Sequence, residues 1–562
     1  MNSSRGFFTA SPSGIVRPSA NSGDRQKGFS IDSTVISRLS GPVSSYLLRP
    51  TSSFLELSET QGFQAPLFLL LGDIHESNKG RCAECSCSLK PGHPCCVPID
   101  GYEFFELLGK VSSPSHPVHV YLEWFFSKEL KDKLSSQSPV KVRKYLEEEV
   151  QGHKASHIGP LNRIYANNFA CFFPDWKQKK GFQSIFQDYC PNQSIQWHHV
   201  DLRKVISTYS YDIVDPREEV TLIGTYLYEG LLDWILMEEP FESFRDLLLF
   251  NPRQAAVELI AGFWKYGLSK SESKVVCQSI IKLLDSPEAF ASFFFDWDNE
   301  MFAKRSILSK QVKKQSPYLQ DMDRLREWYT LVLKKYHADQ MRDWIERTKE
   351  TQVQSKATFL KAKQYLFRFF STVDEAMDPQ TQQTSSDIIR FNEWSALESQ
   401  KPTIEDTEYV KTLLEDIGLA MTCSFVDMGI LLRTFKIPVH RLSQESQPQP
   451  FLSVAYFGDD HMKTILKLLV HQLKIYELVP GSVDHVRENR QSEKGLRCLG
   501  LERVQWNLRK EAQRIGVHLP EVHVSRSFSF KKIIQRRQTK RSRSKKRKSP
   551  RRSNKTSRRR SI

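Results

Sequence analysis

The chain has 562 residues, of which 39% are hydrophobic, enough for a globular body of two or three folded units. Its net charge of +16 lies at one end: residues 531–562 hold 17 Lys/Arg and no acid, and subtracting these from 81 leaves 64 basic against 65 acidic residues. With no apolar run near the roughly 18 residues of a spanning helix and no apolar leader, we expect an intracellular protein without a transmembrane segment.

The first predicted units are a disordered N-terminal segment over 1–35 and the first part of an α/β core over 36–205. The Ser, Gly and Asn content of the former favours disorder. Within the latter, segment 53–57 alternates apolar and polar residues and predicts an edge strand. The apolar run 67–71 follows and ends in a polar cluster that includes Asp73 and His75.

A cysteine-rich loop over 80–98 interrupts this part of the core. Its five cysteines have the spacing C-x2-C-x-C-x7-CC, and its Gly and Pro content indicates a loop. Without a secretory signal we expect reduced thiols, and thiolates at this spacing can hold zinc. The candidate zinc ligands are Cys82, Cys85, Cys95 and Cys96. The alternatives are a surface loop without metal, or a loop closed by disulfides in an oxidising compartment.

Two further apolar runs complete the first part of the core. Run 118–122 ends at Glu123, and run 195–200 leads into Asp201-Leu202-Arg203. Residues 206–420 then repeat apolar residues at helical spacing, which predicts a large all-helical insertion.

The second part of the core is predicted over 421–485, followed by a C-terminal extension over 486–525. Its apolar run 452–457 ends in Gly458, Asp459 and His461, so Gly-Asp-x-His occurs after both the first and the last run. Short apolar runs are typical of buried parallel strands. The predicted fold class is therefore α/β: a small, mostly parallel sheet flanked by helices, with the helical insertion and disordered termini.

The polar clusters after these runs predict one functional site. Open α/β sheets place ligands beyond the carboxyl ends of their strands, where clusters from separate strands can meet. The catalytic candidates are His75, Glu123, Arg203 and His461, and the candidate ligands of a divalent metal are His75, Asp73, Asp459 and His461. A histidine or a bound metal would activate water, Glu123 would transfer the proton, and Arg203 would hold an anionic group or an oxyanion. The alternative is that these residues only end strands and cap helices.

The order of these clusters resembles a known superfamily. Gly-x-x-His, Glu after a strand, Asp-x-Arg and a late Gly-x-x-His are similar to the erythromycin esterase-like, ChaN-like and TraB/Tiki superfamily, which implies a hydrolase or metal-dependent protease. That resemblance assigns function to His75, Glu123 and His461, with Arg203 as an anion-binding partner. Motifs for P-loop nucleotide binding, dinucleotide binding, zincin proteolysis and the serine-hydrolase elbow are absent from the sequence.

Other segments, including Leu71 to His75 with the following cysteines and Tyr456 to His461, resemble uncharacterised proteins of large nucleocytoplasmic DNA viruses. This second resemblance implies a viral protein located in the host nucleus, the viral factory or the virion.

The basic tail, 526–562, is predicted to be a separate functional element. Like charges without apolar residues cannot fold alone, and such segments bind nucleic acid or other polyanions or an import receptor. The candidate contacts are Lys540, Arg541, Arg543, Lys545, Lys546, Arg547, Lys548, Arg551 and Arg552. The leading hypothesis is thus a hydrolase acting on a small molecule or peptide and carrying this tail. Its competitor is a non-enzymatic viral structural or DNA-associated protein that retains the fold.

Overall fold

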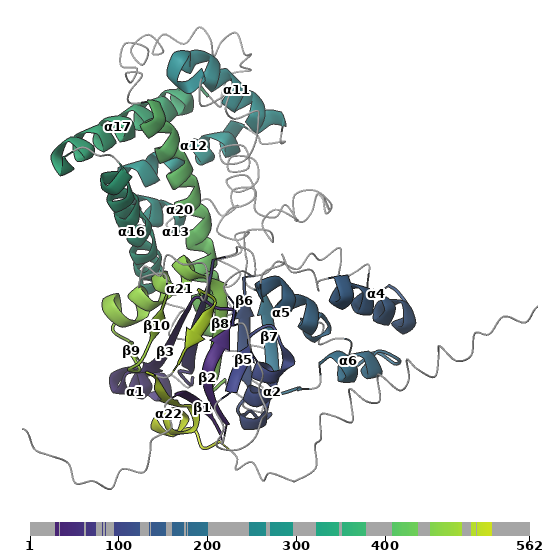
Figure 1. Cartoon of the computed structure of the whole chain (residues 1–562). Coiled ribbons are helices and arrows are strands. Elements are labelled where there is room, and N and C mark those ends of the chain that lie inside the picture. Colours follow the sequence, from purple (N-terminus) through teal and green to yellow (C-terminus); the bar gives the residue numbers. More distant parts are fainter. Residues whose placement is uncertain are drawn as a thin grey trace, which may run out of the picture. The chain divides into compact units, whose positions relative to one another are not determined.

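The structure is a computed structural model of the whole chain (Figure 1). Two units are distinguished by their contacts, Met1–Pro520 and Glu521–Ile562. The described residues all belong to the first unit, so the basic tail lies outside them. They are 28–32, 34–60, 63–74, 81–82, 85, 95–123, 134, 136–152, 160–172, 176, 178–190, 192–199, 247–265, 270–295, 322–347, 351–377, 407–435, 450–485, 496–501 and 503–519.

The larger sheet confirms the predicted α/β class. Its strand order is β10-β3-β4-β8-β6-β7, with β9 also paired to β3. The four predicted runs form the parallel strands, and β3, β9 and β10 add antiparallel pairing at one side. The bounds are β3 Ser44–Pro50, β4 Leu67–Asp73, β6 Val118–Leu122, β7 Ile195–His199, β8 Leu452–Gly458, β9 Tyr476–Leu478 and β10 Val483–Asp484.

The last parallel strand in the sequence lies in the middle of this sheet. β8 pairs with β4 on one side and with β6 on the other, in parallel register with both. Every residue of β4 and β8 is buried, which explains why both read as continuous apolar runs. The segment that carries His461 therefore begins between the ends of two strands that are far earlier in the sequence.

Alternate residues of these strands face two different cores, because side chains on a strand point to opposite faces. Phe68 and Leu70 pack into the core that the helical region shares, together with Ala455 and Phe457 of β8. Leu69 and Val454 belong to the second core, on the other face.

A smaller sheet contributes to the second core. Its order is β11-β2-β1-β12, and β5 also pairs with β2. Residues 28–31 and 34–35, predicted as part of the disordered segment, instead form β1 and begin β2, because β12 from the C-terminal extension pairs with β1. The bounds are β1 Gly28–Ile31, β2 Thr34–Ser40, β5 Cys95–Pro98, β11 Cys498–Gly500 and β12 Gln505–Asn507.

Helices surround the sheets. The prediction of an edge strand over 53–57 is wrong: these residues lie within α1, which buries Phe54 and Ser58 on one face. The other bounds around the sheets are α1 Ser52–Thr60, α2 Tyr102–Val111, α4 Pro139–Gly152, α5 Pro160–Asn168, α6 Gln183–Tyr189, α21 Asp459–Leu466 and α22 Leu508–Arg514, with a 3₁₀ turn at Phe169–Phe172 and a π-helical turn at Lys467–Gln472.

The helical region confirms the predicted insertion over its described part (Figure 1). Its last helix, α20, crosses the predicted boundary at residue 420 and contacts both α16 and α21. The bounds are α11 Pro252–Lys265, α12 Lys270–Asp285, α13 Pro287–Phe295, α16 Met322–Arg347, α17 Gln352–Ala376 and α20 Thr407–Thr434. No helix in the described ranges is long and apolar enough to cross a membrane.

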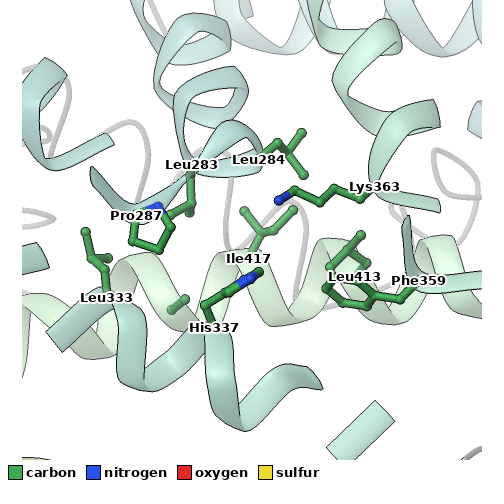
Figure 2. A pocket seen from close by; sticks show the side chains of 10 residues that line it. Leu283, Leu284, Pro287, Leu333, His337, Phe359, Lys363, Leu413 and Ile417 are labelled. Carbon is green, nitrogen blue, oxygen red and sulfur yellow. The ribbon is translucent and has the colours of Figure 1, made fainter. Parts of the chain in front are cut away.

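A small pocket lies among α12, α13, α16, α17 and α20 (Figure 2). Apolar side chains line most of it, and His337 and Lys363 extend toward it. Burial lowers the pKa of both groups. Its volume of about 20 Å³ holds about one water molecule, far below the size of a ligand pocket, so we assign it no function.

Candidate functional site

The site is built at the carboxyl ends of β6 and β8. Glu123 follows β6 directly, and α21 begins at Asp459 directly after β8. The Gly458 backbone N–H donates to Glu123 Oε2 at 2.7 Å, and the Glu123 N–H donates to the Tyr456 carbonyl at 3.3 Å. These two bonds fix the Glu123 side chain at the start of α21.

His461, in the first turn of α21, is buried between two carboxylates. Its Nδ1 donates to Asp427 Oδ1 at 2.8 Å, and its Nε2 lies 3.6 Å from Glu123 Oε1. Asp427, on α20, is fully buried, and the Tyr336 hydroxyl of α16 donates to its other oxygen at 2.6 Å. The site thus joins two sheet segments to two helices of the helical region.

Electrostatics in this cluster favour a protonated imidazole. Burial by itself lowers the pKa of His461, but Asp427, a hydrogen bond with the Cys423 side chain and Glu123 together raise it well above its ordinary value. Burial, followed by the charge of Asp427, likewise raises the pKa of Tyr336. Tyr336 therefore stays a neutral donor that holds Asp427 in place.

Asp459 belongs to a neighbouring cluster. Ser44 Oγ donates to its Oδ1, and Lys463 Nζ lies 2.5 Å from its Oδ2. Burial raises its pKa and these two partners oppose that shift. A side-chain carbon at Gly72 would collide with both Asp459 and Ser44, so this glycine permits the close approach of these two side chains to β4.

Asp73, at the end of β4, forms a buried ion pair with Arg497 of the C-terminal extension. Arg497 is fully buried and also donates to the Gly41 carbonyl at 2.9 Å. Burial, and then the charge of Asp73, raise the pKa of the neighbouring Tyr456. Asp73 and Asp459 are thus each neutralised by a cation, which does not suit a shared metal site with His461.

The structure brings together His461 and Glu123 of the four predicted catalytic residues. His75 and Arg203 lie outside the described residues, and so do the nine predicted nucleic-acid contacts. In the described ranges the single group of three or more potential metal ligands is the cysteine group below, so the divalent-metal site with His75 stays a prediction.

Sequence reasoning missed Asp427, Tyr336 and Cys423. One signal was available: Asp427 interrupts an apolar helical stripe, and it lies on the same helix face as Leu431 and Phe435. A buried acid on an apolar face needs a partner, but the sequence does not identify which residue supplies it.

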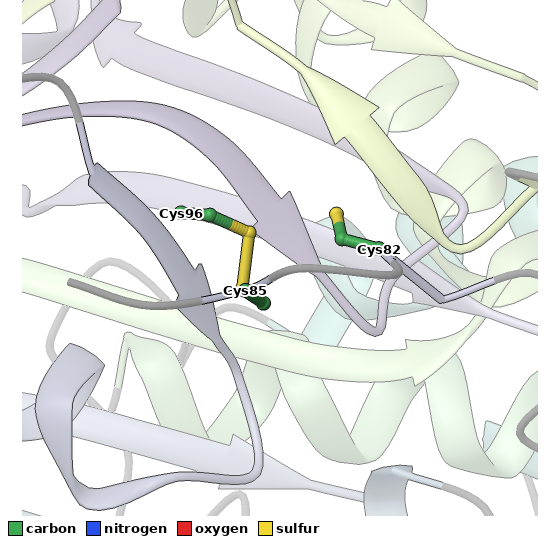
Figure 3. Close-up of side chains that lie close together, drawn as sticks. All are labelled: Cys82, Cys85 and Cys96. Atoms are coloured by element: carbon green, nitrogen blue, oxygen red, sulfur yellow. A yellow bond between two sulfur atoms is a disulfide. The ribbon is translucent and has the colours of Figure 1, made fainter.

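All four predicted zinc ligands are disulfide-bonded, whereas the sequence predicts reduced thiols. Cys85 pairs with Cys96 (Figure 3). Cys82 pairs with Cys498 of β11, which closes a loop across almost the whole first unit. Cys95 is also disulfide-bonded.

The sulfurs of Cys82, Cys85 and Cys96 lie within 4.8 Å of one another, so as thiolates they could hold a metal ion. Disulfides are the alternative that the sequence analysis gives for this loop. The cysteines of these disulfides lie close together because β5 and β11 both pair with β2.

Comparisons with protein-family models, with curated proteins and with solved structures find no match for this chain.

Proposed function

We propose that Glu123, His461 and Asp427 form the acid–base centre of a hydrolase. The observation that carries this proposal is the buried imidazole of His461, which donates to Asp427 at Nδ1 and faces Glu123 at Nε2. A base held by an orienting carboxylate, at the carboxyl end of a parallel strand, is a recurrent arrangement for proton transfer. His461 and Glu123 are also two of the residues to which the superfamily resemblance assigns function.

In this mechanism each residue has a distinct task. Asp427, held by Tyr336, orients the imidazole and stabilises its positive charge. His461 first gives a proton to the leaving group and then takes a proton from the attacking water. Glu123 accepts or relays the proton taken from water. Arg203 is the candidate for holding the oxyanion.

The test measures hydrolysis of chromogenic acetate and phosphate esters and of a fluorescent protein substrate by the full chain. We expect turnover of at least one of these, with His461→Gln lowering kcat/KM by about 10²–10⁴-fold. His471→Gln is the matched control, because His471 is an exposed histidine on the following turn. Turnover that survives His461→Gln, or no turnover of any substrate, contradicts the proposal.

A second function is proposed for the basic tail: binding of nucleic acid or another polyanion. Its 17 Lys/Arg without an acid support it, because released counterions drive such binding. The chain ending at residue 520 should lose affinity for a fluorescent DNA duplex, and the full chain should bind it with a steep salt dependence. Equal affinity with and without residues 521–562 contradicts the proposal, and it also removes the support for the non-enzymatic, DNA-associated alternative.

We further propose that the cysteine group binds Zn²⁺ when its disulfides are reduced. Cys82, Cys85 and Cys96 supply three sulfurs, and Cys498 becomes a fourth once its bond to Cys82 opens. Four thiolates suit tetrahedral zinc. Metal analysis of reduced protein should give one zinc, which Cys85→Ser removes and Cys277→Ser keeps. A reduced protein without zinc contradicts this assignment.

A further inference from the structure

Cys423 differs from the other cysteines of the described part of the chain. Cys277 and Cys423 are the cysteines there that form no disulfide; Cys277 is fully buried, whereas Cys423 is partly exposed. A buried thiol packs as an inert apolar group, but a partly exposed thiol beside a histidine has the surroundings of a reactive one. Among the described residues, Cys423 is therefore the thiol whose surroundings favour nucleophilic chemistry.

The position of Cys423 on α20 brings it to the same imidazole that Asp427 holds. Residues four apart on a helix lie on one face, so the Cys423 and Asp427 side chains are neighbours. A hydrogen bond joins the side chains of Cys423 and His461, and Nδ1 of His461 donates to Asp427 at 2.8 Å. One turn of α20 thus supplies both a thiol and a carboxylate to one histidine.

We propose that Cys423 is the nucleophile of an acyl-transfer reaction in which His461 is the proton carrier and Asp427 orients His461. A nucleophile beside a base, with the base held by a third group, is the arrangement that activates cysteine and serine in covalent catalysis. This inference rests on the proposed function and gives that site a covalent step.

The first step forms a thioester. In the reacting state His461 has taken the proton of the Cys423 thiol, and the sulfur attacks the carbonyl carbon of the substrate, forming a C–S bond. As the bond from this carbon to the leaving group breaks, His461 returns the proton to the leaving oxygen or nitrogen.

The second step regenerates the enzyme. Water attacks the thioester carbon while His461 takes its proton, the C–S bond breaks, and the thiolate is restored beside the imidazolium. The balance is one acyl compound and one water converted to a carboxylic acid and an alcohol or amine.

The charges around the thiol favour a neutral acyl group over a phosphate ester. The described side chains nearest to His461 include two carboxylates, Asp427 and Glu123, and Lys463 is paired with Asp459 and Asp484. A dianionic phosphate would be repelled by these carboxylates, whereas an ester, thioester or amide carbonyl is uncharged until the transition state. The substrate class inferred here is therefore a carboxylic acid derivative.

The first experiment measures thiol reactivity and needs no knowledge of the natural substrate. The full chain is treated with iodoacetamide, and alkylation of each cysteine is followed by peptide mass spectrometry. We expect Cys423 to be alkylated at least about 10-fold faster than Cys277 and to slow by a similar factor in both His461→Gln and Asp427→Asn. A Cys423 rate that is unchanged in both variants overturns the proposal, because the thiol is then not activated by His461.

The second experiment separates this inference from the proposed function. With p-nitrophenyl acetate, rapid acid quench should trap one acetyl group on Cys423, and Cys423→Ala should lower acylation by about 100-fold or more. Cys277→Ala is the matched control and should retain the adduct and the turnover. Circular dichroism and thermal midpoints establish that each variant is folded.

The outcomes of the second experiment are distinct. Turnover that persists in Cys423→Ala but is lost in His461→Gln overturns the covalent step and leaves the acid–base site intact. Turnover that persists in both variants contradicts both proposals. An absence of any adduct and any turnover in the wild-type chain overturns the acyl-transfer assignment.

Discussion

Asp427→Asn is the substitution that most directly tests the buried cluster around His461. The change keeps the shape of the side chain and its bonds to His461 and Tyr336 but removes the charge that stabilises the imidazolium. Removing one partner of a buried ion pair typically costs about 3–5 kcal/mol. Because Glu123 remains 3.6 Å from Nε2, we expect a loss near the lower end, about 3 kcal/mol at pH 6.

The pH dependence gives this prediction its sign. The folded-state pKa of His461 is raised well above 6.5, so the stability that its protonation contributes is complete below about pH 6.5 and is lost as pH rises through the folded pKa. The stability difference between wild type and Asp427→Asn should therefore shrink as the pH rises above about 6.5.

Urea unfolding at a series of pH values between 6 and 9 measures this difference. Asp460→Asn is the matched control, because Asp460 is an exposed acid in the same turn as His461 and should change stability little. A cost below about 1 kcal/mol, or one that stays constant across this pH range, refutes a protonated His461 held by Asp427.

Three further substitutions test the surroundings of the site and the helical region. Gly72→Ala should destabilise by about 1–3 kcal/mol in urea unfolding, because its methyl group collides with Asp459; a neutral effect contradicts the close approach. Arg497→Met should cost about 3–5 kcal/mol by leaving Asp73 buried without its cation, and adding Asp73→Asn should recover part of this loss. Thr351→Ala removes the capping box of α17 and should lower its thermal stability by about 1 kcal/mol, whereas Thr351→Ser should not.

Sequence patterns predicted those parts of the fold in which burial acts along the chain. The four apolar runs became the parallel strands; β4, β6 and β8 lie inside the sheet and are buried almost throughout, whereas β7 lies at its edge and exposes Gln196. The strand prediction for 53–57 is wrong because a pattern of only five residues cannot distinguish a strand from a helix that buries a single face. Helix α1 buries Phe54 and Ser58 in this way.

Predictions that depend on distant segments were less successful. The N-terminal prediction extended the disorder of the Ser-, Gly- and Asn-rich start too far along the chain. Residues 28–31 and 34–35 lie in strands, because β12 from the other end of the unit supplies backbone partners to β1. Whether Cys82 is a thiol or a disulfide depends similarly on Cys498, which lies far from the cysteine-rich loop in the sequence.

The sequence by itself determined the α/β class, the helical region and the two strand ends that carry Glu123 and His461, because burial and strand ends leave local patterns. Only the tertiary structure decided that β8 lies between β4 and β6, and that α20 brings Asp427 and Cys423 to His461. Strand order and the packing of a helix against a sheet are set by contacts between segments that are separate in the sequence, 34 residues apart for Asp427 and His461 and 335 for Glu123 and Gly458, and such contacts leave no periodicity in the sequence.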